Sequence, residues 1–182
     1  MLRTLGRWCP RRLRAVCAAL ALVCVASTAA LAETAPPTVS VLTFGPGTHP
    51  FFKFGHNAIW IQPPGERGTV YNFGTFAFDT PNLIPKFLQG RFQYWLSRGP
   101  IDDTLWSYES SDRTIIVQEL DLTPAEAITL AERLEVNARP ENRAYLYDYF
   151  WDNCSTRVRD AIDGALGGRL RELTVGKPGA QT

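Results

Sequence analysis

Alternation of apolar and polar side chains predicts several β-strands, most of them in the first half of the chain. Five segments alternate in this way and are rich in β-branched and aromatic residues: 39–44 (VSVLTF), 56–62 (HNAIWIQ), 69–73 (TVYNF), 91–96 (RFQYWL) and 113–122 (RTIIVQELDL). Residues 63–65 (Pro-Pro-Gly) separate the second segment from the third, so these two are expected to form a hairpin.

Helical spacing of apolar residues predicts two longer helices in the second half. The first follows Thr123-Pro124-Ala125-Glu126, a capping box with proline at the first helical position, and runs to about Asn137. The second begins at Cys154, directly after the cap-type residue Asn153, and ends before two glycines at 167–168. Shorter helical segments are expected at 80–90 and 102–110, and the aromatic segment 144–151 is expected to be extended or irregular.

The order of these elements determines the expected fold class. Strands and helices are interleaved unevenly, whereas a parallel sheet of βαβ units would need regular alternation. We therefore predict an α+β fold in which helices flank an antiparallel sheet.

The first 32 residues have the features of a secretory signal peptide. Five arginines precede an apolar run at 15–26, and Ala30-Leu31-Ala32 forms an A-x-A cleavage site. The apolar run is shorter than the roughly 20 residues that a spanning helix needs, although an uncleaved anchor remains the alternative. We expect export to the periplasm or another extracytoplasmic compartment, with residues 33–182 forming a single domain. Any membrane contact of that domain would be peripheral.

Removal of this leader changes the charge of the protein. The loss of five arginines leaves 14 of the 19 basic residues against 18 acidic ones and moves the net charge from +1 to −4. A mildly acidic domain without a basic stripe argues against a nucleic-acid partner.

Leader removal also leaves a single cysteine, Cys154. A thiol at a helix N-terminus is favoured as thiolate by the helix dipole, which is the placement expected of a nucleophile. An unpaired thiol is also a liability in an oxidising compartment. The structural alternative is that Cys154 joins Val158, Ala161 and Ala165 on one apolar helix face and is a core residue.

Cysteine catalysis also needs a base and donors for a developing oxyanion. Of the two histidines, His56 is preferred over His49, since it opens a strand and would be held rigidly. Asn72 on the returning strand is the candidate third member that orients the imidazole, and Tyr71 is the alternative. The Cys154 backbone N–H and Asn153 are candidate oxyanion or positioning groups. No ligand-like spacing or glycine-rich phosphate motif is present, so we expect neither a metal nor a cofactor.

Three stretches resemble one protein family: LTFGPGTHPFFKFGHNAIWI, VYNFGTFAFDTPN and ENRAYLYDYFWDNCSTRVRDAIDGALGG. They resemble the N-terminal periplasmic domain of the Lnb-type lipoprotein transacylases over roughly residues 41–170. That family is similar to permuted papain-like enzymes of the NlpC/P60 kind, in which a histidine strand precedes the cysteine helix. The resemblance implies Cys154 as the nucleophile that takes an acyl group as a thioester, His56 as the base and Asn72 as the third polar residue.

The resemblance also implies a lipoprotein or lipid acyl donor as the partner. Relatives usually continue beyond the position of Gly179, often into membrane-spanning helices, so we expect this domain to be C-terminally shortened. The leading hypothesis is an exported thiol-dependent acyltransferase or hydrolase. The alternatives are a cell-wall peptide hydrolase of the same fold and a non-catalytic periplasmic binding module.

Overall fold

The structure is a computed structural model that describes residues 35–49, 52–90 and 92–177. The predicted signal peptide at 1–32 and the C-terminal residues 178–182 lie outside the described residues.

The centre of the fold is a six-stranded sheet with the strand order β5-β1-β2-β3-β4-β6, and every neighbouring pair is antiparallel. The strands are β1 (Thr38–Phe44), β2 (His56–Gln62), β3 (Thr69–Thr75), β4 (Gln93–Pro100), β5 (Ile115–Glu119) and β6 (Ala144–Leu146). The hairpin between β2 and β3 forms as predicted, because the Pro-Pro-Gly turn returns the chain beside the same strand.

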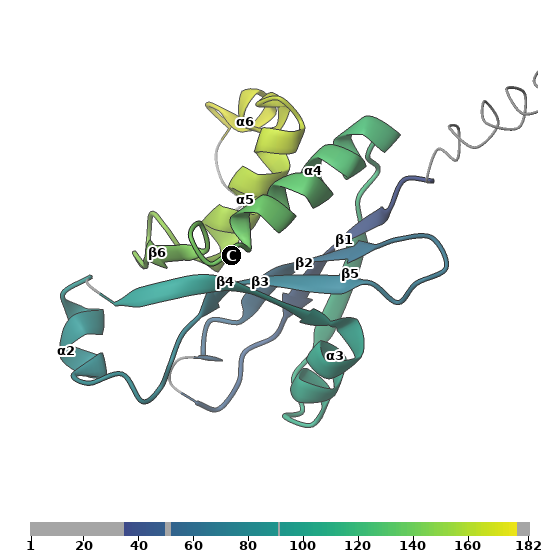
Figure 1. The fold of residues 1–182 in the computed structure, drawn as a ribbon. Helices are drawn as coiled ribbons and strands as arrows, with labels where there is room; N and C mark the ends of the chain where they lie inside the picture. Colours follow the sequence, from purple (N-terminus) through teal and green to yellow (C-terminus); the bar gives the residue numbers. More distant parts are fainter. Residues whose placement is uncertain (1–34, 50–51, 91, 178–182) are drawn as a thin grey trace, which may run out of the picture. The chain divides into compact units, whose positions relative to one another are not determined.

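Helices cover both faces of this sheet, with α4 and α5 on one side and α3 on the other (Figure 1). The helices are α2 (Leu83–Leu88), α3 (Ile101–Glu109), α4 (Pro124–Asn137), α5 (Cys154–Ala165) and α6 (Arg169–Thr174). Thr123 and Glu126 form the predicted capping box at the start of α4.

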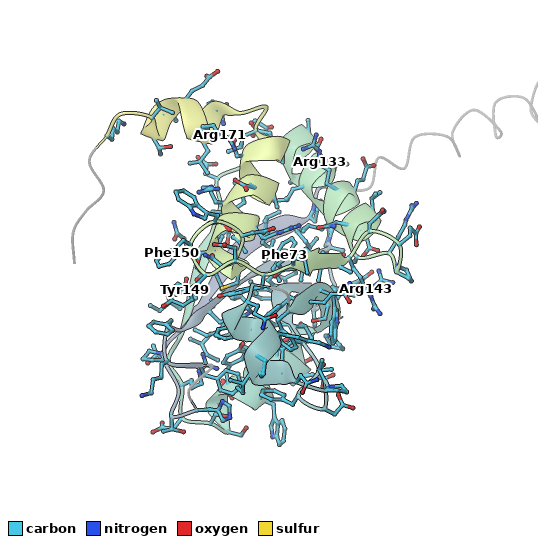
Figure 2. All side chains as sticks on the ribbon, turned by 90° about the vertical axis from the view of Figure 1, so that its left-hand side faces the viewer. Phe73, Arg133, Arg143, Tyr149, Phe150 and Arg171 are labelled. Carbon is cyan, nitrogen blue, oxygen red and sulfur yellow. The ribbon has the colours of Figure 1, made fainter. Side chains whose placement is uncertain are left out.

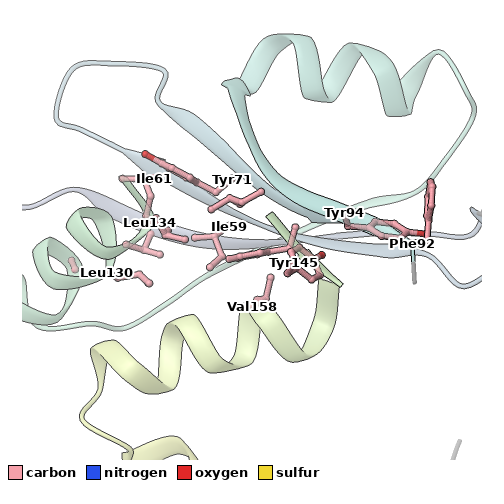
Figure 3. Close-up of a cluster of buried hydrophobic side chains, with 13 residues drawn as sticks. Ile59, Ile61, Tyr71, Phe92, Tyr94, Leu130, Leu134, Tyr145 and Val158 are labelled. Atoms are coloured by element: carbon pink, nitrogen blue, oxygen red, sulfur yellow. The ribbon is translucent and has the colours of Figure 1, made fainter. Parts of the chain in front are cut away.

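The two faces bury two separate hydrophobic clusters. On the larger one, Ile59 and Ile61 of β2 pack with Leu130 and Leu134 of α4 and with Val158 of α5 (Figure 3). On the other face, the cluster under α3 contains Leu42, Phe44, Ala58, Val70 and Ile101. Alternation along β2 therefore sends successive side chains to opposite helical layers.

The predicted α+β class with an antiparallel sheet and flanking helices is confirmed, with differences at the ends of elements. Only 144–146 of the aromatic segment pair as a strand, because Asp148 then closes a turn by accepting from the backbone N–H groups of Phe150 and Trp151. Helix α6 was not predicted. It begins after Gly168, where the sequence shows only a glycine stop followed by a polar segment.

Candidate active site

The N-terminus of α5 is built by side chains of the motif DNCSTR. Asn153 is the N-cap, and its side-chain oxygen Oδ1 accepts from the backbone N–H groups of Ser155 and Thr156 at 3.0 and 3.1 Å. The Thr156 hydroxyl accepts in return from the Asn153 backbone N–H at 2.8 Å. Cys154 is thereby placed at the first position of the helix, where its own N–H has no acceptor within the helix.

An ion pair also stabilises the start of α5. Arg157 binds Asp152 through two contacts of 2.5 and 2.6 Å, and its guanidinium lies 4.0 Å over the ring of Tyr145 on β6. The bidentate geometry fixes the arginine in one orientation. The start of α5 is therefore held to the edge of the sheet on the side of β6.

Cys154 is half-buried and carries a perturbed thiol. Burial raises the pKa of the thiol, but a hydrogen bond and the charge of the His56 imidazole lower it. The Asn57 backbone N–H and the Ser155 hydroxyl lower the pKa further, and the result is a value of about 7. A thiol of this kind is substantially ionised at neutral pH.

His56 is the first residue of β2, opposite Phe44 at the end of β1. Its Nε2 lies 3.2 Å from Oδ1 of Asn72 on β3. Since the amide oxygen can only accept, Nε2 donates in this contact, and Nδ1 is the ring nitrogen left for proton exchange. This is the relation that the sequence suggested for Asn72.

The β2–β3 ladder explains how these groups meet. Its pairing covers Ile59–Ile61 and Thr69–Tyr71 only, so in the described structure the strand ends that carry His56 and Asn72 are joined by side chains rather than by the ladder. Helix α5 begins beside these two strand ends. The imidazole is further confined by stacking on Phe44, with ring centroids 5.9 Å apart and an interplanar angle of 14°.

Asn57 contributes to the site and was not predicted. Its amide nitrogen donates to the Ser155 hydroxyl at 2.9 Å, and its backbone N–H hydrogen-bonds the Cys154 thiol. It lies on the same face of β2 as Ile59 and Ile61, which is the face that α4 and α5 cover. The signal was present in the motif FGHNA, but a polar residue beside the candidate base was not weighed.

The structure separates the other candidates from the chemistry. The Tyr71 hydroxyl donates to Glu135 of α4, which takes it away from His56. His49 lies in the β1–β2 loop against the rings of Phe52 and Phe78. The side-chain nitrogen of Asn153 donates to the Tyr149 carbonyl at 2.9 Å, and its side-chain oxygen caps α5. Both groups are therefore engaged in positioning Cys154, and neither is left to donate to an oxyanion.

Only the first part of the aromatic segment before Cys154 lies in the core. Tyr145 is 8% exposed, whereas Phe150 is 75% and Trp151 83% exposed. Figure 2 shows Tyr149 and Phe150 projecting from the loop ahead of α5. The ring of Tyr149 also meets that of Phe54 in the β1–β2 loop at 5.3 Å. An exposed aromatic rim, Phe54, Tyr149, Phe150 and Trp151, therefore lies on the two loops that precede His56 and Cys154 in the chain.

Comparison with known proteins gives one assignment. The family described as the Lnb N-terminal periplasmic domain matches residues 28–178. Comparisons with curated proteins and with solved structures gave no significant match. Within the described residues, no helix has the length and apolar character needed to cross a bilayer.

Proposed function

Because the chain belongs to the Lnb N-terminal periplasmic domain family, and is thus an extracytoplasmic module of Lnb-type proteins, we propose that it is a thiol-dependent acyltransferase or hydrolase. Cys154 is the nucleophile, His56 the general base and acid, and Asn72 the residue that orients the imidazole.

One observation carries this proposal: Asn72, His56 and Cys154 form a connected series of side chains at a helix N-terminus. The side-chain oxygen of Asn72 lies 3.2 Å from Nε2 of His56. Interaction with the His56 imidazole helps to lower the pKa of the Cys154 thiol to about 7. A thiol that was only a core residue would have its pKa raised by burial alone. The net lowering therefore favours catalysis over the binding-module hypothesis.

The reaction proceeds through a thioester. The Cys154 sulfur attacks the carbonyl carbon of an ester or amide, and the C–S bond forms as the carbonyl electron pair moves to oxygen. When the intermediate collapses, the bond to the leaving group breaks, and His56 supplies the proton that the leaving oxygen or nitrogen needs. Attack by water or by an acceptor amine or hydroxyl then releases the acyl group and restores the thiol.

The arrangement is consistent with a permuted papain-like architecture. The histidine strand precedes the cysteine helix in the chain, and the helix N-terminus meets an antiparallel sheet beside that strand. Asn72 supports the imidazole through Nε2.

For the substrate, we propose a lipid or lipoprotein acyl donor. The exposed aromatic rim offers apolar surface directly ahead of Cys154, and aromatic side chains of this kind favour the interface between lipid and water. The domain would then meet the membrane peripherally. Cell-wall peptide hydrolysis by the same residues is the alternative.

Acyl transfer to Cys154 is tested by intact mass of the exported protein after incubation with p-nitrophenyl octanoate or with purified muropeptides. We expect one octanoyl adduct that hydroxylamine removes, and no adduct in Cys154→Ala. Thr174→Ala is the control, since it removes a hydroxyl of α6 and keeps the thiol and the groups that lower its pKa. Release of peptide fragments from muropeptides without octanoylation would favour the hydrolase alternative. Octanoylation that persists in Cys154→Ala, or a wild type inert to both substrates, would refute the mechanism.

A further inference from the structure

Tyr145 carries a buried hydroxyl that the hydrogen bonds of the described structure leave without a partner. The residue is 8% exposed. The guanidinium of Arg157 lies over its ring, and Tyr94 is its partner in the β4–β6 ladder. Buried hydroxyls normally find a partner, because leaving one unpaired costs about 1–3 kcal/mol. An orphaned donor beside a reactive thiol therefore points to a group that arrives with the substrate.

Gly74 lies between the Tyr145 hydroxyl and the side chains of Cys154 and His56. A side-chain carbon at Gly74 would stand 3.8 Å from Cys154 Cβ, 3.8 Å from His56 Cε1 and 3.9 Å from the Tyr145 hydroxyl oxygen. Nucleophile, base and orphaned donor thus border one small space. Gly74 has a φ of +99° where the β3–β4 register shifts, and the absence of a side chain keeps this space empty.

We propose that the Tyr145 hydroxyl binds the carbonyl oxygen of the acyl substrate and stabilises the oxyanion that forms when Cys154 attacks. This inference rests on the proposed function and adds the oxyanion site to it. The hydroxyl donates a hydrogen bond and keeps its proton, while the carbonyl electron pair moves to oxygen and returns when the leaving group departs. The first-turn N–H of Cys154 is the second donor.

Tyr145 suits this role better than the neighbouring polar groups. The amide nitrogen of Asn153 is engaged by the Tyr149 carbonyl. Tyr147 is less buried and stacks on Tyr94, with centroids 4.4 Å apart. Burial, with a smaller contribution from the nearby Cys154 charge, raises the pKa of Tyr145, so the phenol stays protonated and remains a donor at working pH.

The test separates oxyanion stabilisation from effects on the thiol. Tyr145→Phe removes only the hydroxyl, and Tyr147→Phe is the matched control two residues along the chain. Octanoylation of Cys154 by p-nitrophenyl octanoate passes through an oxyanion, whereas alkylation by iodoacetamide does not. We expect Tyr145→Phe to slow octanoylation by about 10²–10³-fold, the usual effect of losing one oxyanion donor. Iodoacetamide alkylation should stay at the wild-type rate, and the melting temperature should not fall, since the substitution removes an unpaired buried hydroxyl.

Each other result has a distinct meaning. Octanoylation of folded Tyr145→Phe at the wild-type rate would overturn the oxyanion site and leave the Cys154 mechanism standing. Equal slowing of octanoylation and alkylation would show that the hydroxyl acts on the reactivity of the thiol, and this result would also overturn the oxyanion site. A wild type that alkylates but never octanoylates would contradict the proposed function and the inference with it.

Discussion

Replacement of His56 by alanine should return the Cys154 thiol to an ordinary or raised pKa. The imidazole is the principal group that opposes the effect of burial, and the lowering from 9.0 to about 7 depends on it. In His56→Ala the thiol keeps its burial and loses this interaction, so its pKa should reach 9 or above.

The size of the effect on reactivity follows from two opposing factors. At pH 7 about half of the thiol is ionised when its pKa is about 7, and about 1% when it is 9, a loss of about 50-fold in thiolate. A thiolate of higher pKa is more nucleophilic, by about 6- to 10-fold for this difference. The alkylation rate at pH 7 should therefore fall by only about 5- to 8-fold, while the midpoint of the pH profile moves by the full difference.

The assay is the rate of iodoacetamide alkylation from pH 5.5 to 10, read by intact mass of the exported protein. In protein that begins at Glu33, Cys154 is the single cysteine and so the single site of modification. Asn72→Ala is the matched control: the base remains but is no longer oriented, so a midpoint between those of wild type and His56→Ala is expected. Superimposable profiles for wild type and His56→Ala would show that the imidazole does not act on the thiol.

Three further predictions address the helix end, the pH dependence of stability and the membrane. Asn153→Ala should lower the free energy of unfolding by about 1 kcal/mol in urea titrations, because the N-cap of α5 is lost; an unchanged midpoint would contradict the capping role. The lowered thiol pKa stabilises the fold fully above the unfolded pKa and less as pH falls toward 7, so the melting temperature of wild type relative to Cys154→Ser should rise from pH 6 to pH 9; a flat difference would argue against the shift. Phe150→Ser with Trp151→Ser should reduce co-sedimentation with phosphatidylcholine–phosphatidylglycerol vesicles while leaving iodoacetamide alkylation unchanged, and undiminished co-sedimentation would exclude the aromatic rim as the contact.

Most of the fold was predictable because its signals are local. Residue alternation marks β1, β2 and β3, and the Thr123–Glu126 box gives the start of α4 from four consecutive residues. The unpredicted helix α6 lacks such a signal, since Gly168 precedes it where a conventional cap would stand. It is held from a distance, through the Arg171 backbone N–H that donates to the buried Asp163 of α5.

Some residues of the candidate site were likewise predictable from local signals, whereas others depended on contacts between distant segments. Cys154 and His56 follow from the count of cysteines and histidines and from the helix start and strand they begin. Asn72 follows from the hairpin, whose turn places it near His56, although the choice between Asn72 and Tyr71 needed the face that each side chain takes.

The sequence by itself thus determined the α+β class, the family and the residue types available for thiol chemistry, because these depend on composition and on neighbours along the chain. The tertiary structure decided which side chains meet. It brought β6 and the end of β3 to the start of α5, and so placed Tyr145 and Gly74 beside Cys154. It also exposed Phe150 and Trp151, which an aromatic run alone would assign to the core. Such contacts depend on packing between segments far apart in the chain, and no local pattern encodes them.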